Sequence, residues 1–247
     1  MRGAVVFAMI LGVFTFGCSA GSGALPAPPV RADDLLGSCP NADVLEGLYR
    51  DLPLHFEEDP TAMEPLACQA AKGSLDLTRF QKRASVALLS LRAMTFDVAV
   101  PWTNRPLYDW VISTIPGIRF GGPSGWPAGG PIVFRGDSNN CLTSGPPSDR
   151  WVSPRSGCGV PDFLAAVVHD VRLAEGPVDR CDANGSENTI AELGGWGVEY
   201  LFYRLLAEHS GKFLDAPGDV GSDYYRDEAR YAALGICSRR FCHDQCP

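Results

Sequence analysis

Apolar side chains recur at intervals of three and four residues in six stretches of the chain, and this spacing is typical of amphipathic helices. The pattern predicts helices at 43–50, 75–94, 105–114, 161–175, 189–210 and 223–234. Boundary residues support several of them. Pro161 stands at a favoured first-turn position, and Gly176 and Gly211 follow two of the predicted ends. We therefore expect a mostly helical protein.

The stretch 117–159 interrupts this pattern, because Gly and Pro are dense there and helical spacing is lost. Two short apolar runs within it, 118–120 and 131–135, are predicted strands. Strands in the middle of a helical chain indicate an α+β fold. With no second linker along the chain, we expect one globular domain at 31–247.

The N-terminus has the features of an export signal. Arg2 precedes an uninterrupted apolar run at 4–16, which is shorter than the roughly 20 residues needed to cross a bilayer. The pair Gly17-Cys18 resembles a bacterial lipobox, which predicts a signal peptide at 1–17 and lipidation of Cys18. The alternative is simple cleavage after Ala20. The uncharged, Pro-rich segment 18–30 is then a flexible tether.

Cysteine usage and charge agree with export. Apart from Cys18 there are eight cysteines, an even number that would allow four disulfides in an oxidising compartment, with the pairing left open. The net charge is −8, which argues against nucleic acid as a partner because such binding depends on Lys and Arg. We expect a protein of the cell envelope or a secreted one, which contacts the membrane only through its N-terminal lipid.

One segment carries candidate chemistry. The run from His169 to Asp179 resembles the metzincin pattern H-E-x-x-H-x-x-G-x-x-H, in which two histidines one helical turn apart hold zinc and the Glu is the general base. Position by position, His169 keeps the first ligand and Asp170 replaces the base. Leu173 stands where the second histidine belongs, Gly176 keeps the turn, and Asp179 is an oxygen ligand in third place.

The wider region is similar to a family of uncharacterised bacterial exported proteins. In that family a HEARH-type helix is followed by a cysteine and then by a segment like 188–200 of this chain (NTIAELGGWGVEY). The resemblance covers 98–209 and implies a zincin-like fold and metallopeptidase ancestry, without a substrate. No methionine follows His169, so the methionine turn of metzincins is absent from the sequence.

Two glutamates are candidates for a further zinc ligand, since a catalytic zinc usually has three protein ligands. Glu192 is also spaced from Thr189 as in a helix capping box. Glu199 shares a helix face with Glu192, beside aromatic residues, and is either a site residue or the partner of a buried Arg. The glycines at 194, 195 and 197 indicate either close packing against another helix, plausibly that of His169, or else a kink or a late helix start.

These observations lead to three hypotheses. The first is a zincin-like, disulfide-stabilised envelope protein whose degenerate site binds a peptide or an envelope component without a cofactor. The second is an active zinc hydrolase that uses His169, Asp179 and a downstream glutamate, with Asp170 as base. The third is a disulfide-rich structural domain in which His169 is a core residue. The oligomeric state is left open.

Overall fold

The computed structural model describes residues 30–69, 75–121, 130–134, 150–152, 159–176, 190–216 and 223–241. The predicted signal peptide, Cys18 and Asp179 lie outside these ranges. The described helices are α1 (Ala32–Gly37), α2 (Ala42–Asp51), α3 (Arg79–Ala93), α4 (Leu107–Thr114), α6 (Val160–Ala174), the 3-10 helix η1 (Ile190–Glu192), α7 (Gly195–His209) and α8 (Tyr224–Arg240). The strands are β1 (Leu54–Phe56), β2 (Ile118–Phe120) and β3 (Ile132–Phe134). The fold is therefore α+β and mostly helical, as predicted.

The helix α3 begins later than its apolar spacing predicts. Leu77 forms an isolated antiparallel bridge with Cys68, so the chain is extended up to that point. Thr78 then caps the helix: its hydroxyl accepts a hydrogen bond from the Gln81 amide, and its own amide donates to the Gln81 side chain. This capping box stops the helix from extending back over the apolar residues before it.

The predicted helix 189–210 is wrong at its start. The 3-10 helix η1 comes first, Leu193 takes a left-handed φ of 52°, and α7 begins only at Gly195. A left-handed residue interrupts the helical hydrogen-bond ladder, so η1 and α7 are separate elements. The predicted helix 223–234 instead continues to Arg240, because Ile236 and Cys237 are buried.

Three short parallel strands form a sheet in the order β1-β2-β3. The strand β1 was not predicted, since three residues carry little periodicity and the pairing partner is far along the chain. Along β2, Ile118 and Phe120 are buried while Arg119 faces the other way and pairs with Glu57 at 3.2 Å. One face of the sheet therefore carries the core.

A cluster of five phenylalanines joins the sheet to α3 and α6. In-register pairing places one ring from each strand in a row, and the β1 and β2 rings stack at 4.9 Å between centroids. A ring from α3 meets the row edge-on at 5.2 Å, and a ring from α6 lies 5.2 Å from the β3 ring. The members are Phe56, Phe80, Phe120, Phe134 and Phe163. This packing anchors the helix that carries His169 to the sheet.

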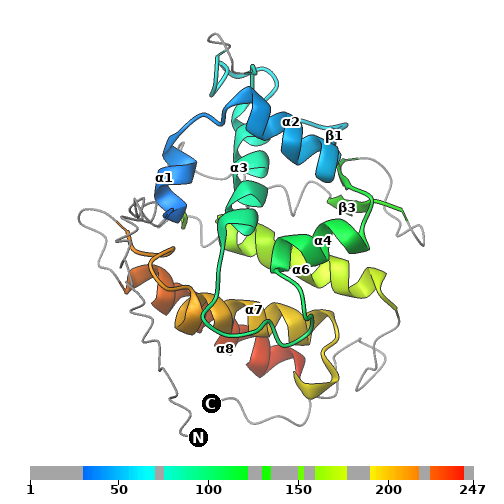
Figure 1. The fold of residues 1–247 in the computed structure, drawn as a ribbon, viewed down its shortest axis with the longest axis vertical. Coiled ribbons are helices and arrows are strands. Elements are labelled where there is room, and N and C mark those ends of the chain that lie inside the picture. The colour runs from blue at the N-terminus through cyan, green and yellow to red at the C-terminus, as the bar shows by residue number, and fades with distance from the viewer. Residues whose placement is uncertain are drawn as a thin grey trace, which may run out of the picture.

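The helices α7 and α8 lie side by side and run past α6 on the side away from α2 (Figure 1). The helix α3 crosses α6 and connects it to the N-terminal helices. A disulfide between Cys39 and Cys68 links the loops after α1 and before α3, and Cys237 is also disulfide-bonded. Within the described residues, no helix has the length and apolarity to span a bilayer.

Candidate functional site

The site lies where α6 and α7 cross in antiparallel directions. Asp162 and His169 are seven residues apart, so they share one face of α6, and Glu199 and Tyr203 share one face of α7. The Tyr203 hydroxyl donates to Asp162 Oδ1 at 2.7 Å, and His169 Nδ1 lies 3.0 Å from Glu199 Oε2. Two polar pairs therefore join the helices through their facing sides.

His169 is held on several sides at once. Because a carboxylate oxygen accepts hydrogen bonds, Nδ1 carries a proton toward Glu199, and in the neutral form of the ring the lone pair is then on Nε2. The Trp196 ring meets the imidazole edge-to-face at 4.4 Å, and the guanidinium carbon of Arg240 lies 3.9 Å from the centroid of Trp196. Glu199 thus pairs with His169.

Gly195 is the point of closest approach between the two helices. A Cβ placed on Gly195 would lie 2.8, 2.9 and 3.0 Å from Nε2, Cε1 and Cδ2 of His169. Since the three distances are nearly equal, the glycine packs against the face of the ring and not in line with the Nε2 lone pair. The predicted close packing of the glycine segment against the His169 helix is confirmed. The late helix start is also observed, because Gly194 precedes and Gly195 opens α7.

Asp170, the predicted general base, is half-buried on α6. Burial is the main cause that raises the pKa of its carboxyl to about 7. A positive charge on His169 lowers the pKa of Asp170, and the negative charge of Glu199 raises it. At neutral pH the carboxyl is therefore divided between protonated and ionised forms. A group with such a pKa can exchange protons near pH 7, which general acid–base chemistry requires.

The other motif positions do not complete a zinc site within the described residues. Leu173 is half-buried and supplies no donor atom, and Gly176 takes a φ of 151° just after α6. Asp179 and the side chain of Glu192 lie outside the described residues. Glu199 uses one carboxylate oxygen on Nδ1, the place of the partner that orients a metal-binding histidine and not of the ligand itself.

No group of three His, Cys, Asp or Glu side chains in the described part of the chain is arranged to hold a metal ion. His169 Nε2 is the donor that the motif retains there. Within the described residues, this nitrogen is one of the three protein ligands that a catalytic zinc usually has.

A chain of hydrogen bonds fixes the C-terminal end of α6. Arg172 Nε donates to the Leu193 carbonyl at 2.6 Å, and its Nη1 pairs with Glu175 at 2.6 Å. Glu175 in turn accepts from Trp110 Nε1 of α4 at 2.8 Å. The left-handed Leu193 therefore has its carbonyl held by α6, which sets where α7 begins and so places Gly195 against His169.

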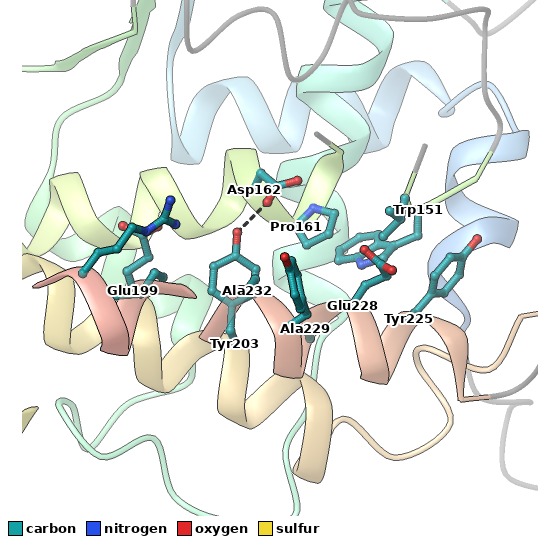
Figure 2. Close-up of a pocket in the computed structure, with 13 residues that line it drawn as sticks. Trp151, Pro161, Asp162, Glu199, Tyr203, Tyr225, Glu228, Ala229 and Ala232 are labelled. Carbon is teal, nitrogen blue, oxygen red and sulfur yellow. Dashed lines mark hydrogen bonds between the residues drawn. The ribbon is translucent and has the colours of Figure 1, made fainter. Parts of the chain in front are cut away.

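A cavity of about 320 Å³ lies between the first turn of α6, the middle of α7 and α8. Figure 2 shows Asp162 of α6 above Tyr203 of α7, and Glu199 of α7 and Glu228 of α8 also line the cavity. Of the residues singled out by the zincin-like motif, Glu199 lines this cavity, whereas His169 and Asp170 do not. Glu199 therefore connects the motif to the cavity.

Two polar residues of the cavity wall have altered acidity. Burial raises the pKa of Asp162, although hydrogen bonds from the Tyr203 hydroxyl and the Gly159 amide act in the opposite direction. Burial, together with the charges of Asp162 and Glu199, raises the pKa of Tyr203 well above its usual value. Tyr203 therefore stays protonated and acts as a donor, which holds Asp162 in one orientation.

Comparison with known proteins adds no relative: no family model, curated protein or solved structure matches this chain. The similarity to bacterial exported proteins of zincin type stays a prediction from the sequence.

Sequence reasoning did not identify Asp162 as part of the site. A signal was present, because Asp162 lies seven residues before His169 and thus on the same helix face. The contribution of Arg240 could not be found this way. Its position over Trp196 depends on how α8 packs against α7, and no local spacing encodes that contact.

Proposed function

We propose that this chain is an exported protein of zincin-like ancestry with a degenerate metal site, and that it acts by binding a peptide or an envelope component. Export and an N-terminal lipid on Cys18 follow from the sequence features at 1–30. Binding takes place in the cavity bordered by α6, α7 and α8. In this proposal the helix pair of a former hydrolase has kept its shape and its cleft, while the second zinc ligand has become Leu173.

The position of Glu199 supports the proposal most. Its carboxylate bonds His169 and also lines the cavity, so the remnant of the motif now builds a wall of the binding site. The cavity volume falls at the lower end of the range typical of ligand pockets, about 300–1,000 Å³. Its wall combines buried aromatic rings with a few oriented polar groups, which is also typical of ligand sites.

Metal analysis tests the degenerate site. Purified protein is loaded with zinc, desalted and analysed for bound metal, in parallel with His169→Ala and with His55→Ala as a control on β1. We expect substoichiometric zinc that is the same in all three proteins. Stoichiometric zinc that disappears only in His169→Ala overturns the proposal.

A matched pair of α8 variants tests the binding site. Ala232 lines the cavity, so Ala232→Phe fills it, whereas Leu234→Phe adds a ring at an exposed position of the same helix that does not line it. We expect peptides selected from a random library on the unchanged protein to lose binding to Ala232→Phe and to keep binding to Leu234→Phe. Equal binding to both variants places the site elsewhere.

An active zinc hydrolase is the second candidate, and two observations favour it. Metal-binding histidines usually donate their other ring nitrogen to a carboxylate, as His169 does to Glu199. The pKa of Asp170, raised to about 7, also suits a general base at neutral pH. This candidate requires Asp179 and a further glutamate as ligands, and it predicts the stoichiometric, His169-dependent zinc that would overturn our proposal.

The membrane attachment has a separate test. Lipidation at Cys18 predicts that the protein purified from the membrane fraction begins at Cys18 and carries added acyl mass in intact mass spectrometry. Cys18→Ser should release the protein from that fraction. An unmodified chain that begins after Ala20 contradicts lipidation and leaves the proposed binding function unaffected.

A further inference from the structure

The residues that line the cavity beside Glu199 indicate the chemical class of its ligand. Its inner wall is made of buried rings and small apolar groups, among them Trp151, Pro161 and Ala229. Its mouth is formed by exposed side chains of α8, including Glu228 and Tyr231. A ligand group that fits this cavity therefore has an apolar stem and a polar end.

The charges around the cavity are mostly negative. Three carboxylates line it, from Asp162, Glu199 and Glu228, against one cationic side chain among the described lining residues, Arg239. Asp162 and Glu199 are held in place by Tyr203 and His169 respectively. Glu228 is exposed and forms no ion pair or hydrogen bond with another described residue, so its charge is available to a ligand.

Aromatic rings supply a second attraction for a cation. Tyr203 and Tyr225 are buried in the wall together with Trp151, and Tyr231 at the mouth is 78% exposed. The face of an aromatic ring is electronegative and attracts ammonium and guanidinium groups, more strongly when the contact is desolvated. An exposed tyrosine beside a free carboxylate is suited to such a contact.

We infer that the cavity binds a cationic side chain, lysine or arginine, of a peptide. The aliphatic stem of such a side chain packs against the apolar wall while its charged end meets the exposed carboxylate of Glu228. This inference rests on the proposed binding function and adds the chemical class of the ligand. Arg239 has its Nε bonded to the Gly235 carbonyl at 2.7 Å and opposes a cation from the rim.

Calorimetric titration with blocked tripeptides, acetyl-Ala-X-Ala-amide, tests this inference on the purified protein. X is Lys, Arg, norleucine or Glu, and n-butylamine serves as a free amine without a peptide. We expect Lys and Arg to bind about tenfold more tightly than norleucine, as one or two favourable cation contacts would give. The difference should shrink at high salt, which screens exposed charges.

Substitution of the exposed Glu228 tests the contact with the cation directly, and substitution of Arg239 on the same helix serves as a comparison. Glu228→Gln should weaken binding of the Lys peptide about threefold, because it removes one partly solvated charge. Arg239→Gln should change the binding less, because Arg239 lies about 16 Å further along α8. Glu46→Gln, at an exposed position of α2 that does not line the cavity, should change nothing. Both test residues are exposed, so the variants should fold.

The outcomes separate the inference from the proposed function. Equal binding of the norleucine and Lys peptides, or tighter binding of the Glu peptide, overturns the inference that the ligand is a cation but leaves peptide binding intact. If n-butylamine binds as tightly as the Lys peptide, the cavity binds free amines and the inference that the cation belongs to a peptide is overturned. If none of the peptides binds the unchanged protein, and Ala232→Phe behaves in the same way, both the inference and the proposed site are refuted.

Discussion

The contact between Gly195 and His169 allows a sharp test of how the site is built. In Gly195→Ala the new methyl group would lie 2.8 Å from Nε2 of His169, closer than real contacts allow. The imidazole cannot move away freely, since it is bonded to Glu199 at 3.0 Å and packs against Trp196. Either the helices separate or the hydrogen bond breaks.

Both responses cost a similar amount. Overpacking a well-packed contact destabilises by about 1–3 kcal/mol, and losing a hydrogen bond to a charged group costs about 1.5–3 kcal/mol. We therefore expect Gly195→Ala to lower the free energy of unfolding by about 1–3 kcal/mol. In the background of His169→Ala the ring is absent, so the same substitution should be close to neutral.

Urea unfolding followed by circular dichroism measures all four members of this double-mutant cycle, with a chelator present so that metal binding does not contribute. The control is Gly47→Ala in α2, where the added methyl group would meet only Arg50 Nη2 at 3.9 Å. That control should gain up to about 1 kcal/mol from helix propensity. An equal loss from Gly195→Ala with and without His169 would refute the proposed contact.

Three further predictions concern stability. Burial raises the pKa of Asp170 in the folded protein to about 7, against about 3.9 in the unfolded chain. The contribution of this carboxyl to the free energy of unfolding is therefore lost as the pH rises from about 4 to about 7. Asp170→Asn should be more stable than the unchanged protein at pH 8, by a few kcal/mol at most, and not at pH 4; the same difference at both values contradicts this. Replacing Cys39 and Cys68 by Ala opens a loop of 29 residues and should cost about 3–4 kcal/mol by chain entropy; an unchanged urea midpoint excludes a stabilising bridge. Tyr203→Phe removes the donor to Asp162 at 2.7 Å and should cost about 1–3 kcal/mol; a stability equal to that of the unchanged protein shows that water replaces the hydroxyl.

Local sequence features predicted most helices because their causes are local. The helix α6 follows its apolar spacing and its first-turn Pro161, and α2 begins where the Asn41 side chain caps the Asp43 amide. The strands β2 and β3 were also predicted, because apolar residues within a Gly- and Pro-rich stretch leave few other structures. The strand β1 and the start of α7 were not, because pairing and packing with distant segments decide them.

For the site, the sequence determined which chemical groups are present and which are lost. A histidine, an aspartate in place of the base and Leu173 in place of the second ligand can be read directly from the motif, since helix geometry relates residues one turn apart. The glycines at 194, 195 and 197 of the predicted helix indicated close packing against another helix as one of two alternatives, and Gly195 does lie against His169.

Only the tertiary structure decided what those groups do for one another. The pairing of Glu199 with His169 depends on the antiparallel crossing of α6 and α7, over a separation of 30 residues. The cavity depends in addition on α8, which contributes Glu228 and Tyr231 to the lining that Asp162 and Glu199 of the other two helices share. Local spacing determines the face of a helix on which a side chain lies, whereas the packing of three helices determines what that face meets.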